Sequence, residues 1–497
     1  MTDTTVLDQA PDTLPQGNVS NRRLAFGAAV MTGANIVKIG IQFAMLPIMA
    51  RLIGPGSYGL YALALPTITF MLMVADGGLG NSLARERPEA RAVWASAFWA
   101  VHGLALLLAC AVIGWSFLLA YITNQPQLPA LMAALSIALL FVASSVLPMA
   151  RMLRQGRLHV GASADLVATV VGAGLGIFLA FDGCGTWALV GQYIVTFAIR
   201  AAIMNAVAFE RPAFIFDLGL LRPHLMLGGS IVATKLADYA GRITENTLIT
   251  SILGTSILGA YGFANQIPRF LCESASNPLW AILYVQAVQK SHQAATRAYY
   301  EFSRALGIVL FPVTALAALA SSRMIEVLLG PAWHSAALPL SLLLATSAFP
   351  AIGGLTSALL YAKGRGDMQL LISGTLICGR VLAVLAAGFL GLIGVAAVLG
   401  AINVTYSVIA VMVPARVIGV SPSILLRGLV APFGCAVSAG AAYETLLSTF
   451  GSDIFTVIAG GLLSLLLYVA LLIALERGRL FGDLAMLRSI LGKSSGR

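Results

Sequence analysis

Residues 51–64 read RLIGPGSYGLYALA, and a shift of 200 residues aligns them with SILGTSILGAYGFA at 251–264. Four positions of the two segments are identical: Gly54 and Gly254, Gly59 and Gly259, Tyr61 and Tyr261, and Ala64 and Ala264. Each segment joins two apolar runs through a tight turn. The repetition therefore predicts a chain built from two similar halves.

The composition indicates which solvent surrounds these halves. Of the 497 residues 59% are hydrophobic and only 10% are charged, and the mean hydropathy is +0.90. A soluble protein of this size would have about a quarter of its residues charged. Apolar runs of about 20 residues recur along the chain, as helices that cross a bilayer require, and the alternation of a membrane β-barrel does not occur. The sequence predicts an all-α integral membrane protein.

Fourteen membrane spans are predicted from the apolar runs. They cover 24–50, 58–80, 92–121, 130–150, 162–181, 187–209, 224–253, 258–289, 305–321, 335–361, 370–390, 394–413, 428–448 and 454–475. The repeated turn follows spans 1 and 7, and both are odd-numbered, so the two halves have the same orientation. We expect two six-helix lobes related by a parallel repeat, followed by two C-terminal helices.

This arrangement divides the chain into six parts. They are a cytoplasmic N-terminal tail (1–20), an N-lobe with spans 1–6 (21–210), a cytoplasmic connector that skims the membrane surface (211–223), a C-lobe with spans 7–12 (224–415), spans 13 and 14 (416–475), and a cytoplasmic amphipathic tail (476–497).

The distribution of basic residues predicts the orientation in the membrane. Most Lys and Arg residues fall in the loops after even-numbered spans and in the two tails, whereas the odd-numbered loops hold only Arg51 and Arg323. Cytoplasmic loops carry such an excess, so both termini are expected in the cytoplasm. The bias also accounts for the net charge of +10 without nucleic acid as a partner. Residues 1–20 lack the pattern of a cleavable signal peptide.

One predicted span is unusually polar. Residues 231–249 read IVATKLADYAGRITENTLI, and on a helix the side chains of Lys235, Asp238, Arg242 and Glu245 fall within an arc of about 80°. Charges at membrane depth are costly and normally face a protein interior or a wet cavity. Their alternating signs also permit a ladder of ion pairs along one face, Lys235 to Asp238 to Arg242 to Glu245, so a structural role stays open beside a functional one.

Polar residues on other spans favour a shared cavity. The 200-residue shift places the polar residues of span 1 over those of span 7, and spans 8 and 11 carry further charges. The candidate cavity residues are Asn35, Lys38, Gln42, Lys235, Asp238, Arg242, Glu245, Arg269, Glu273 and Arg380. Asp76, Asp165 and Arg200 lie near predicted cytoplasmic ends, where snorkelling or helix capping explains them.

Motifs for chemistry do not emerge. The five cysteines are scattered, which excludes a CxxC pair or a zinc quartet and favours packing roles. No HExxH and no GxxxxGK[ST] motif occurs. We therefore expect no cofactor, no metal and no ATP hydrolysis by this chain, and transport by alternating access fits better than catalysis.

A family resemblance supports transport. Residues 51–86, RLIGPGSYGLYALALPTITFMLMVADGGLGNSLARE, follow a polar first span and resemble the polysaccharide-biosynthesis (Wzx-type) flippases of the multidrug/oligosaccharidyl-lipid/polysaccharide exporter superfamily. Residues 328–338, LLGPAWHSAAL, are similar to that family's turn before span 10.

The resemblance implies movement of an undecaprenyl-pyrophosphate-linked oligosaccharide across the bacterial inner membrane through a cationic lumen. Partners would be this lipid-linked oligosaccharide, membrane lipids and other polysaccharide assembly proteins. The spans of this chain hold six basic and five acidic residues, so the predicted cavity is mixed in charge. One of the acids could bind a coupling H⁺ or Na⁺.

Two alternatives stay open. A cation-coupled drug or small-molecule antiporter of the same superfamily would normally have twelve spans, and the two C-terminal spans count against it. A membrane polysaccharide polymerase or ligase has similar hydropathy, but it would carry a large external loop with catalytic arginines, and no such loop is predicted here.

Overall fold

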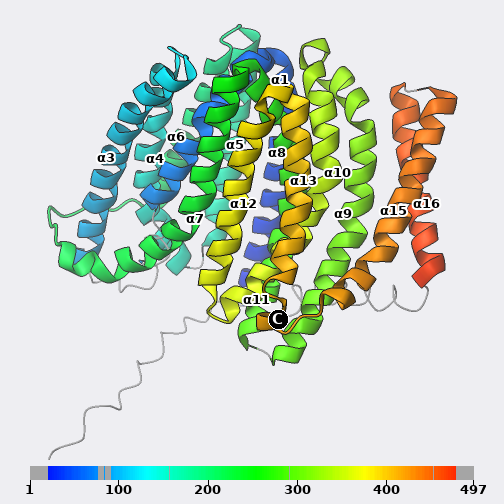
Figure 1. Cartoon of the computed structure of the whole chain (residues 1–497). Coiled ribbons are helices and arrows are strands. Elements are labelled where there is room, and N and C mark those ends of the chain that lie inside the picture. Colours follow the sequence, from blue (N-terminus) through cyan, green and yellow to red (C-terminus); the bar gives the residue numbers. More distant parts are fainter. Residues whose placement is uncertain are drawn as a thin grey trace, which may run out of the picture.

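The structure is a computed structural model that describes residues 21–76, 83, 91–155, 157–289, 291–451 and 453–476. Every regular element within these residues is a helix, and the long helices run side by side as one bundle (Figure 1). The predicted all-α fold is confirmed. The predicted tails at 1–20 and beyond Glu476, and part of the 51–86 segment, lie outside the described residues.

The helices match the predicted spans closely. They are α1 (Asn21–Asp76), α3 (Arg91–Thr123), α4 (Leu128–Arg154), α5 (Leu158–Phe181), α6 (Thr186–Ala208), α7 (Leu218–Leu253), α8 (Thr255–Gln289), α9 (His292–Leu328), the 3₁₀ turn η1 (Pro331–Ala336), α10 (Ala337–Gly354), α11 (Thr356–Ala362), α12 (Gly366–Ala387), the 3₁₀ turn η2 (Gly388–Leu390), α13 (Gly391–Met412), α14 (Ala415–Ile418), α15 (Pro422–Phe450) and α16 (Ile454–Glu476).

Ten stretches of the described residues are long and apolar enough to cross a membrane. Two of them, Gly33–Ala75 and Gly366–Met412, each contain two helical segments separated by a turn. The helices α7 and α8 are not among the ten stretches; they carry the charged residues that the sequence indicates at 231–249 and at Arg269 and Glu273. Together these segments account for the fourteen predicted spans.

Several helices begin earlier than hydropathy predicts, and α9 and α7 show why. α9 begins at His292, whereas the predicted span began at 305, because residues 292–304 form a polar helix with a buried face of Ala295, Ala298 and Phe302. α7 begins at Leu218, before the predicted start at 224, because the Asp217 side chain accepts a hydrogen bond from the Gly219 amide and caps the helix. Hydropathy alone finds the apolar part of such helices and misses the amphipathic turns.

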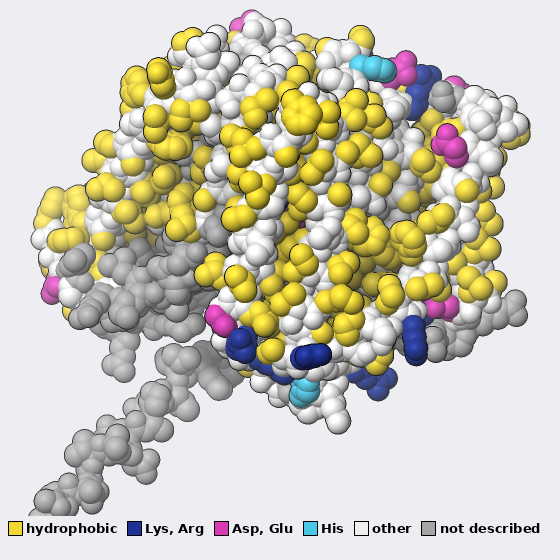
Figure 2. Space-filling view, in the orientation of Figure 1, with side chains coloured by type: hydrophobic (Ala, Val, Ile, Leu, Met, Phe, Trp, Pro, Cys, Tyr) yellow, Lys and Arg dark blue, Asp and Glu magenta, His cyan; other side chains and the backbone are white. Residues whose placement is uncertain are grey.

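The outer wall of the bundle is apolar. Large hydrophobic side chains such as Leu107, Phe178, Leu382 and Leu466 are more than 60% exposed. Figure 2 shows a wall of mainly hydrophobic and uncharged surface, with the visible Lys and Arg side chains near its upper and lower edges. Exposed apolar surface of this extent is what contact with lipid tails requires. The protein is a multi-pass membrane protein.

Helix contacts fall into groups along the chain. Helices α3 to α6 pack with one another and with α1, α7 to α13 pack among themselves, and α15 and α16 pack together beside α9. The most extensive contacts between the first and second groups join α1 to α8, with α7 adding contacts to α1 and α3. The residue bounds of the two lobes stay a prediction.

The repeated segments form the main crossing between the two groups. Gly54 and Gly254 have nearly the same backbone angles, with φ of 75° and 91° and ψ of 167° and 166°, a conformation that favours glycine. Each glycine separates two helices, so each repeat turns the chain at the same point. We call the face of the bundle that carries these two turns the turn side, and the opposite face, where α11 ends, the α11 side.

Beyond the turns, the two repeats touch through matched positions. A β-carbon added at Gly59 would lie 1.8 Å from the Thr255 carbonyl oxygen, and one added at Gly259 would lie 1.9 Å from the Pro55 carbonyl oxygen. The contact is reciprocal under the 200-residue shift, as an interface around a two-fold axis must be. This geometry agrees with the predicted parallel repeat.

The connector ahead of α7 is attached to α3. The Trp99 indole donates a hydrogen bond to the Ala213 carbonyl (3.0 Å), the Ser96 hydroxyl accepts one from the Asp217 amide (2.9 Å), and the Trp99 and Phe214 rings stack at 5.5 Å. Phe214 is 93% exposed, so the connector does not bury its aromatic side chains. This exposure is compatible with the predicted position along the membrane surface.

The tight crossing gives a test of the fold. Because backbone carbonyl atoms cannot yield to a new methyl group, Gly59→Ala is expected to lower the free energy of unfolding by about 1–3 kcal/mol. The thermal unfolding midpoint and the yield of monodisperse protein in detergent measure the effect. Gly114→Ala on α3 is the control, since a β-carbon there has no atom within 4 Å. Equal unfolding midpoints for the two variants would contradict the close contact.

Candidate functional site

A cavity of about 1220 Å³ opens within the bundle. Its walls come from α7, α8, α10 to α13 and the second half of α1. The volume is larger than that of most small-molecule sites. Such a cavity could hold a polar group of considerable size inside a membrane protein.

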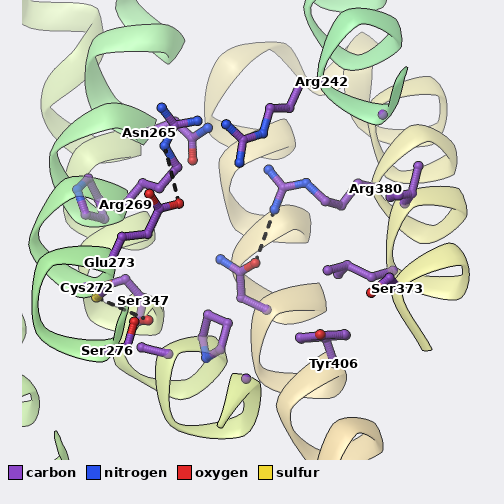
Figure 3. Close-up of a pocket in the computed structure, with 18 of the residues that line it drawn as sticks. Arg242, Asn265, Arg269, Cys272, Glu273, Ser276, Ser347, Ser373, Arg380 and Tyr406 are labelled. Atoms are coloured by element: carbon purple, nitrogen blue, oxygen red, sulfur yellow. Dashed lines mark hydrogen bonds and ion pairs between the residues drawn. The ribbon is translucent and has the colours of Figure 1, made fainter. Parts of the chain in front are cut away.

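Five of the predicted cavity residues line it. Arg242 and Glu245 come from α7, Arg269 and Glu273 from α8, and Arg380 from α12. Figure 3 shows the three arginines at one end of the cavity, with Ser276 and Tyr406 at the other. The three arginines and two glutamates leave one positive charge on the lining, so the cavity is mixed in charge.

Glu245 is bound by Arg380 rather than by its neighbour on α7. Two guanidinium nitrogens of Arg380 donate to the two carboxylate oxygens of Glu245, at 2.7 and 3.1 Å. Tyr261 also donates to Glu245, and Asn403 accepts from Arg380 at 3.3 Å. The carboxylate is therefore neutralised by a bidentate pair. The ion pair of Glu245 with Arg242, which the spacing on α7 permits, does not form, because Arg380 is the partner of Glu245.

The other two arginines are held differently from Arg380. The Arg242 guanidinium lies 5.6 Å from the centre of the Tyr239 ring, and no carboxylate of the described residues lies within ion-pair distance of it. Arg269 lies 3.8 Å from Glu273, and both side chains are about half exposed, so this pair is weak. Both guanidinium groups line the cavity, and the fixed fork of donors that a guanidinium presents suits an anion.

Exposure increases away from the turn side. The exposed fraction of the charged side chains rises from 6% for Glu245 and 20% for Arg380 to 41% for Arg269 and 51% for Glu273. Further along α8 and α11, Tyr284 and Tyr361 are also exposed. The cavity is thus deepest near α7 and opens toward the α11 side.

Buried contacts close the turn side. The Trp333 side chain is fully buried, donates to the Ala50 carbonyl (3.1 Å) and packs edge-on against Tyr58. Tyr58 in turn donates to the Gln266 side chain across the crossing (3.1 Å). With the Gly59–Gly259 contact, these interactions separate the cavity from the turn side.

The predicted residues of span 1 lie elsewhere. Asn35 and Gln42 are exposed and do not line the cavity, and Lys38 forms an ion pair with Asp165 at 3.2 Å. Arg200 binds the other oxygen of Asp165 at 2.9 Å. Asp165 and Arg200 are therefore partners in a three-helix charge cluster of α1, α5 and α6, and the prediction of isolated snorkelling or capping is wrong for them.

Three acidic or basic residues of the sequence analysis lie outside what the structure describes. These are the side chains of Lys235, Asp238 and Asp76. Whether the first two face the cavity stays a prediction.

Several lining residues were not singled out in the sequence. They include Tyr261, Asn265, Gln266, Trp280, Tyr361 and Asn403. Tyr261 belongs to the repeat, which marked its position but not its role. The buried cysteine Cys272 donates to the Ser347 carbonyl at 3.4 Å, and all five cysteines are free. No group of three or more potential metal ligands occurs among the described residues.

Comparison with known proteins identifies relatives of the chain. A family model described as polysaccharide biosynthesis protein matches residues 48–338. The chain is 25% identical to the succinoglycan biosynthesis transport protein ExoT of Rhizobium meliloti, over 59% of this chain and 60% of that protein. It is 23% identical to the lipopolysaccharide biosynthesis protein WzxC of Escherichia coli, over 69% and 70% of the two chains.

A solved structure shares the fold over most of its length. The lipid II flippase MurJ in an inward closed conformation superposes with a TM-score of 0.74, at 10% sequence identity, over 92% of this chain and 99% of that chain. At this identity the likeness establishes the fold alone.

The Glu245–Arg380 pair gives a stability test. Glu245→Ala leaves the Arg380 guanidinium without its carboxylate in a largely buried place, so the free energy of unfolding should fall by about 3–5 kcal/mol. Replacing both residues together, Glu245→Leu with Arg380→Met, should cost less than the single change. Thermal unfolding in detergent measures both. Glu273→Gln is the matched control, with an expected change within about 1 kcal/mol because that pair is half exposed. Equal losses for Glu245→Ala and Glu273→Gln would contradict the assignment.

Proposed function

The chain belongs to the polysaccharide biosynthesis protein family, and on that premise we propose that it is a flippase for a lipid-linked oligosaccharide. Its substrate would be an undecaprenyl-pyrophosphate-linked unit for a surface polysaccharide or exopolysaccharide. The named relatives act in the biosynthesis of succinoglycan and lipopolysaccharide. No catalytic step is proposed, since the chain would only move its substrate.

The observation that carries the proposal is the pair of guanidinium groups that line the cavity from α7 and α8. Arg242 and Arg269 come from two adjacent helices and face one space. Guanidinium groups bind phosphate oxygens with paired hydrogen bonds. A pyrophosphate between them would pair its two negative charges with the two guanidinium groups, which otherwise have to be stabilised within the membrane.

Alternating access would carry the substrate across. The bias of basic residues supports a cytoplasmic α11 side and cytoplasmic termini in the bacterial inner membrane. The cavity would then receive its substrate from the cytoplasm while the Gly59–Gly259 crossing keeps the turn side shut. Export requires this crossing to open and the α11 side to close.

A coupling ion is part of the proposal. Glu273 is a carboxylate of the cavity without a bidentate partner, and it is half exposed. It is therefore better suited than Glu245 to take up H⁺ or Na⁺. Membrane lipids and other polysaccharide assembly proteins are the proposed partners.

The two alternatives are weaker. An antiporter for cationic drugs would favour a cavity of net negative charge, whereas the lining here holds three arginines and two glutamates. A polymerase or ligase would need a large external loop. On the turn side, the connection between α9 and α10 consists mainly of the short turn η1 (Pro331–Ala336), which holds His334 but no arginine.

A complementation experiment tests the function. In a strain that lacks the gene, surface polysaccharide should be lost and its lipid-linked unit should accumulate inside. The wild-type chain should restore export, whereas Arg242→Ala or Lys235→Ala should reduce it at least tenfold while the protein still inserts. Arg323→Ala, at a surface pair with Glu326, is the control and should export normally. Normal polysaccharide delivery by the deletion strain would exclude a flippase.

A disulfide tests alternating access. A β-carbon at Gly56 would lie 3.3 Å from the Ser256 hydroxyl oxygen, a separation compatible with a disulfide between Gly56→Cys and Ser256→Cys. In a chain whose native cysteines are replaced by alanine, oxidation should abolish export and a reductant should restore it. Either single cysteine variant should export normally. Unchanged export by the fully cross-linked protein would show that the crossing does not open.

A further inference from the structure

We propose that Trp280, Tyr284 and Tyr361 form a sugar-binding shelf in the cavity, which holds the glycan of the substrate while the arginines hold its pyrophosphate. This inference rests on the proposed function. It adds where in the cavity the glycan and the pyrophosphate of the substrate bind. The three side chains are called the aromatic shelf below.

The three rings of the aromatic shelf contact one another in a defined geometry. Trp280 and Tyr284 lie one turn apart on α8 and stack with a centroid distance of 5.6 Å and an angle of 4° between the rings. Tyr361 of α11 meets Trp280 edge-on at 6.4 Å. The Trp280 indole donates to the Ser357 hydroxyl at 2.8 Å, which fixes the plane of the ring.

The position of these rings differs from that of aromatic residues on the lipid wall. All three line the cavity, and Tyr284 and Tyr361 are 36% and 37% exposed. The lining around them is polar but uncharged, with Asn277, Gln369 and Ser373 supplying amides and a hydroxyl. This lining suits a ligand that forms hydrogen bonds and can lie against a ring.

A sugar has this combination of properties. The face of a pyranose ring presents C–H bonds with slight positive charge, which pack on the negative face of an aromatic ring. Its hydroxyl groups point outward, where side-chain amides can donate and accept hydrogen bonds. An isoprenoid tail would not need the amides, and a phosphate would not favour the rings.

The spacing along α8 separates the two parts of the substrate. Arg269 and Trp280 are 11 residues apart, which corresponds to about 16 Å along a helix. This is longer than a pyrophosphate group, so the shelf would contact sugar units and not the phosphates. The glycan would extend toward the α11 side, with the pyrophosphate deeper in the cavity.

A binding experiment with two lipids distinguishes the contribution of the glycan from that of the pyrophosphate. The probes are the lipid-linked oligosaccharide purified from the deletion strain and undecaprenyl pyrophosphate without sugar, titrated against the full chain in lipid nanodiscs. The wild type should bind the glycan-bearing lipid at least tenfold more tightly. Trp280→Ala and Tyr361→Ala should remove most of that difference and leave the affinity for undecaprenyl pyrophosphate unchanged, whereas Arg242→Ala should weaken both lipids.

Controls distinguish the shelf from a folding effect. Trp280→Phe keeps a ring and should retain most of the preference, and Trp115→Ala, at an exposed tryptophan of α3, should behave as the wild type. If the wild type binds both lipids equally, or if Trp280→Ala keeps the full preference, the shelf is wrong while the flippase proposal stands. If the wild type binds neither lipid, both the proposed function and the shelf fail.

Discussion

The closest backbone approach between the two repeats is the constraint on which the structure depends. At Gly59 and Gly259 each repeat occupies the space that a β-carbon of the other would need. This contact brings α1 and α8 together at the turn side and closes one end of the cavity. Because the contact is made by backbone atoms, it can be tight at these two positions without side chains that interlock there.

Charge neutralisation decides what the cavity can bind. The bidentate pair of Glu245 with Arg380 neutralises the charge of the deepest carboxylate and of one of the three arginines. The positive charge of Arg242 and Arg269 then faces the open volume. A membrane protein that kept all five charges in mutual pairs would have a neutral cavity with little preference for a phosphate group. The arrangement thus links helix packing to the chemistry of the ligand.

The sequence predicted the fold well because lipid imposes a strong pattern. Apolar runs located the crossings, and the repeat at 51–64 and 251–264 marked the segments that meet. The sequence predicted less of the site, since helical periodicity shows which residues share one face of a helix but not which residues of other helices contact that face. Glu245 therefore seemed to pair with Arg242 one turn away, whereas its partner is Arg380, 135 residues further along the chain. The Lys38–Asp165–Arg200 cluster was missed for the same reason, and the aromatic shelf because Trp280 and Tyr361 resemble ordinary membrane-interface residues in a sequence.

The attachment of the connector to α3 has a consequence for movement between the two groups of helices. Residues 213–217 are hydrogen-bonded to Ser96 and Trp99, so the connector is held against α3. Because α7 also contacts α1 and α3, a movement between the two groups of helices would either break these contacts or carry α7 along with the first group. The exposed side chain of Phe214 would stay with α3 in either case.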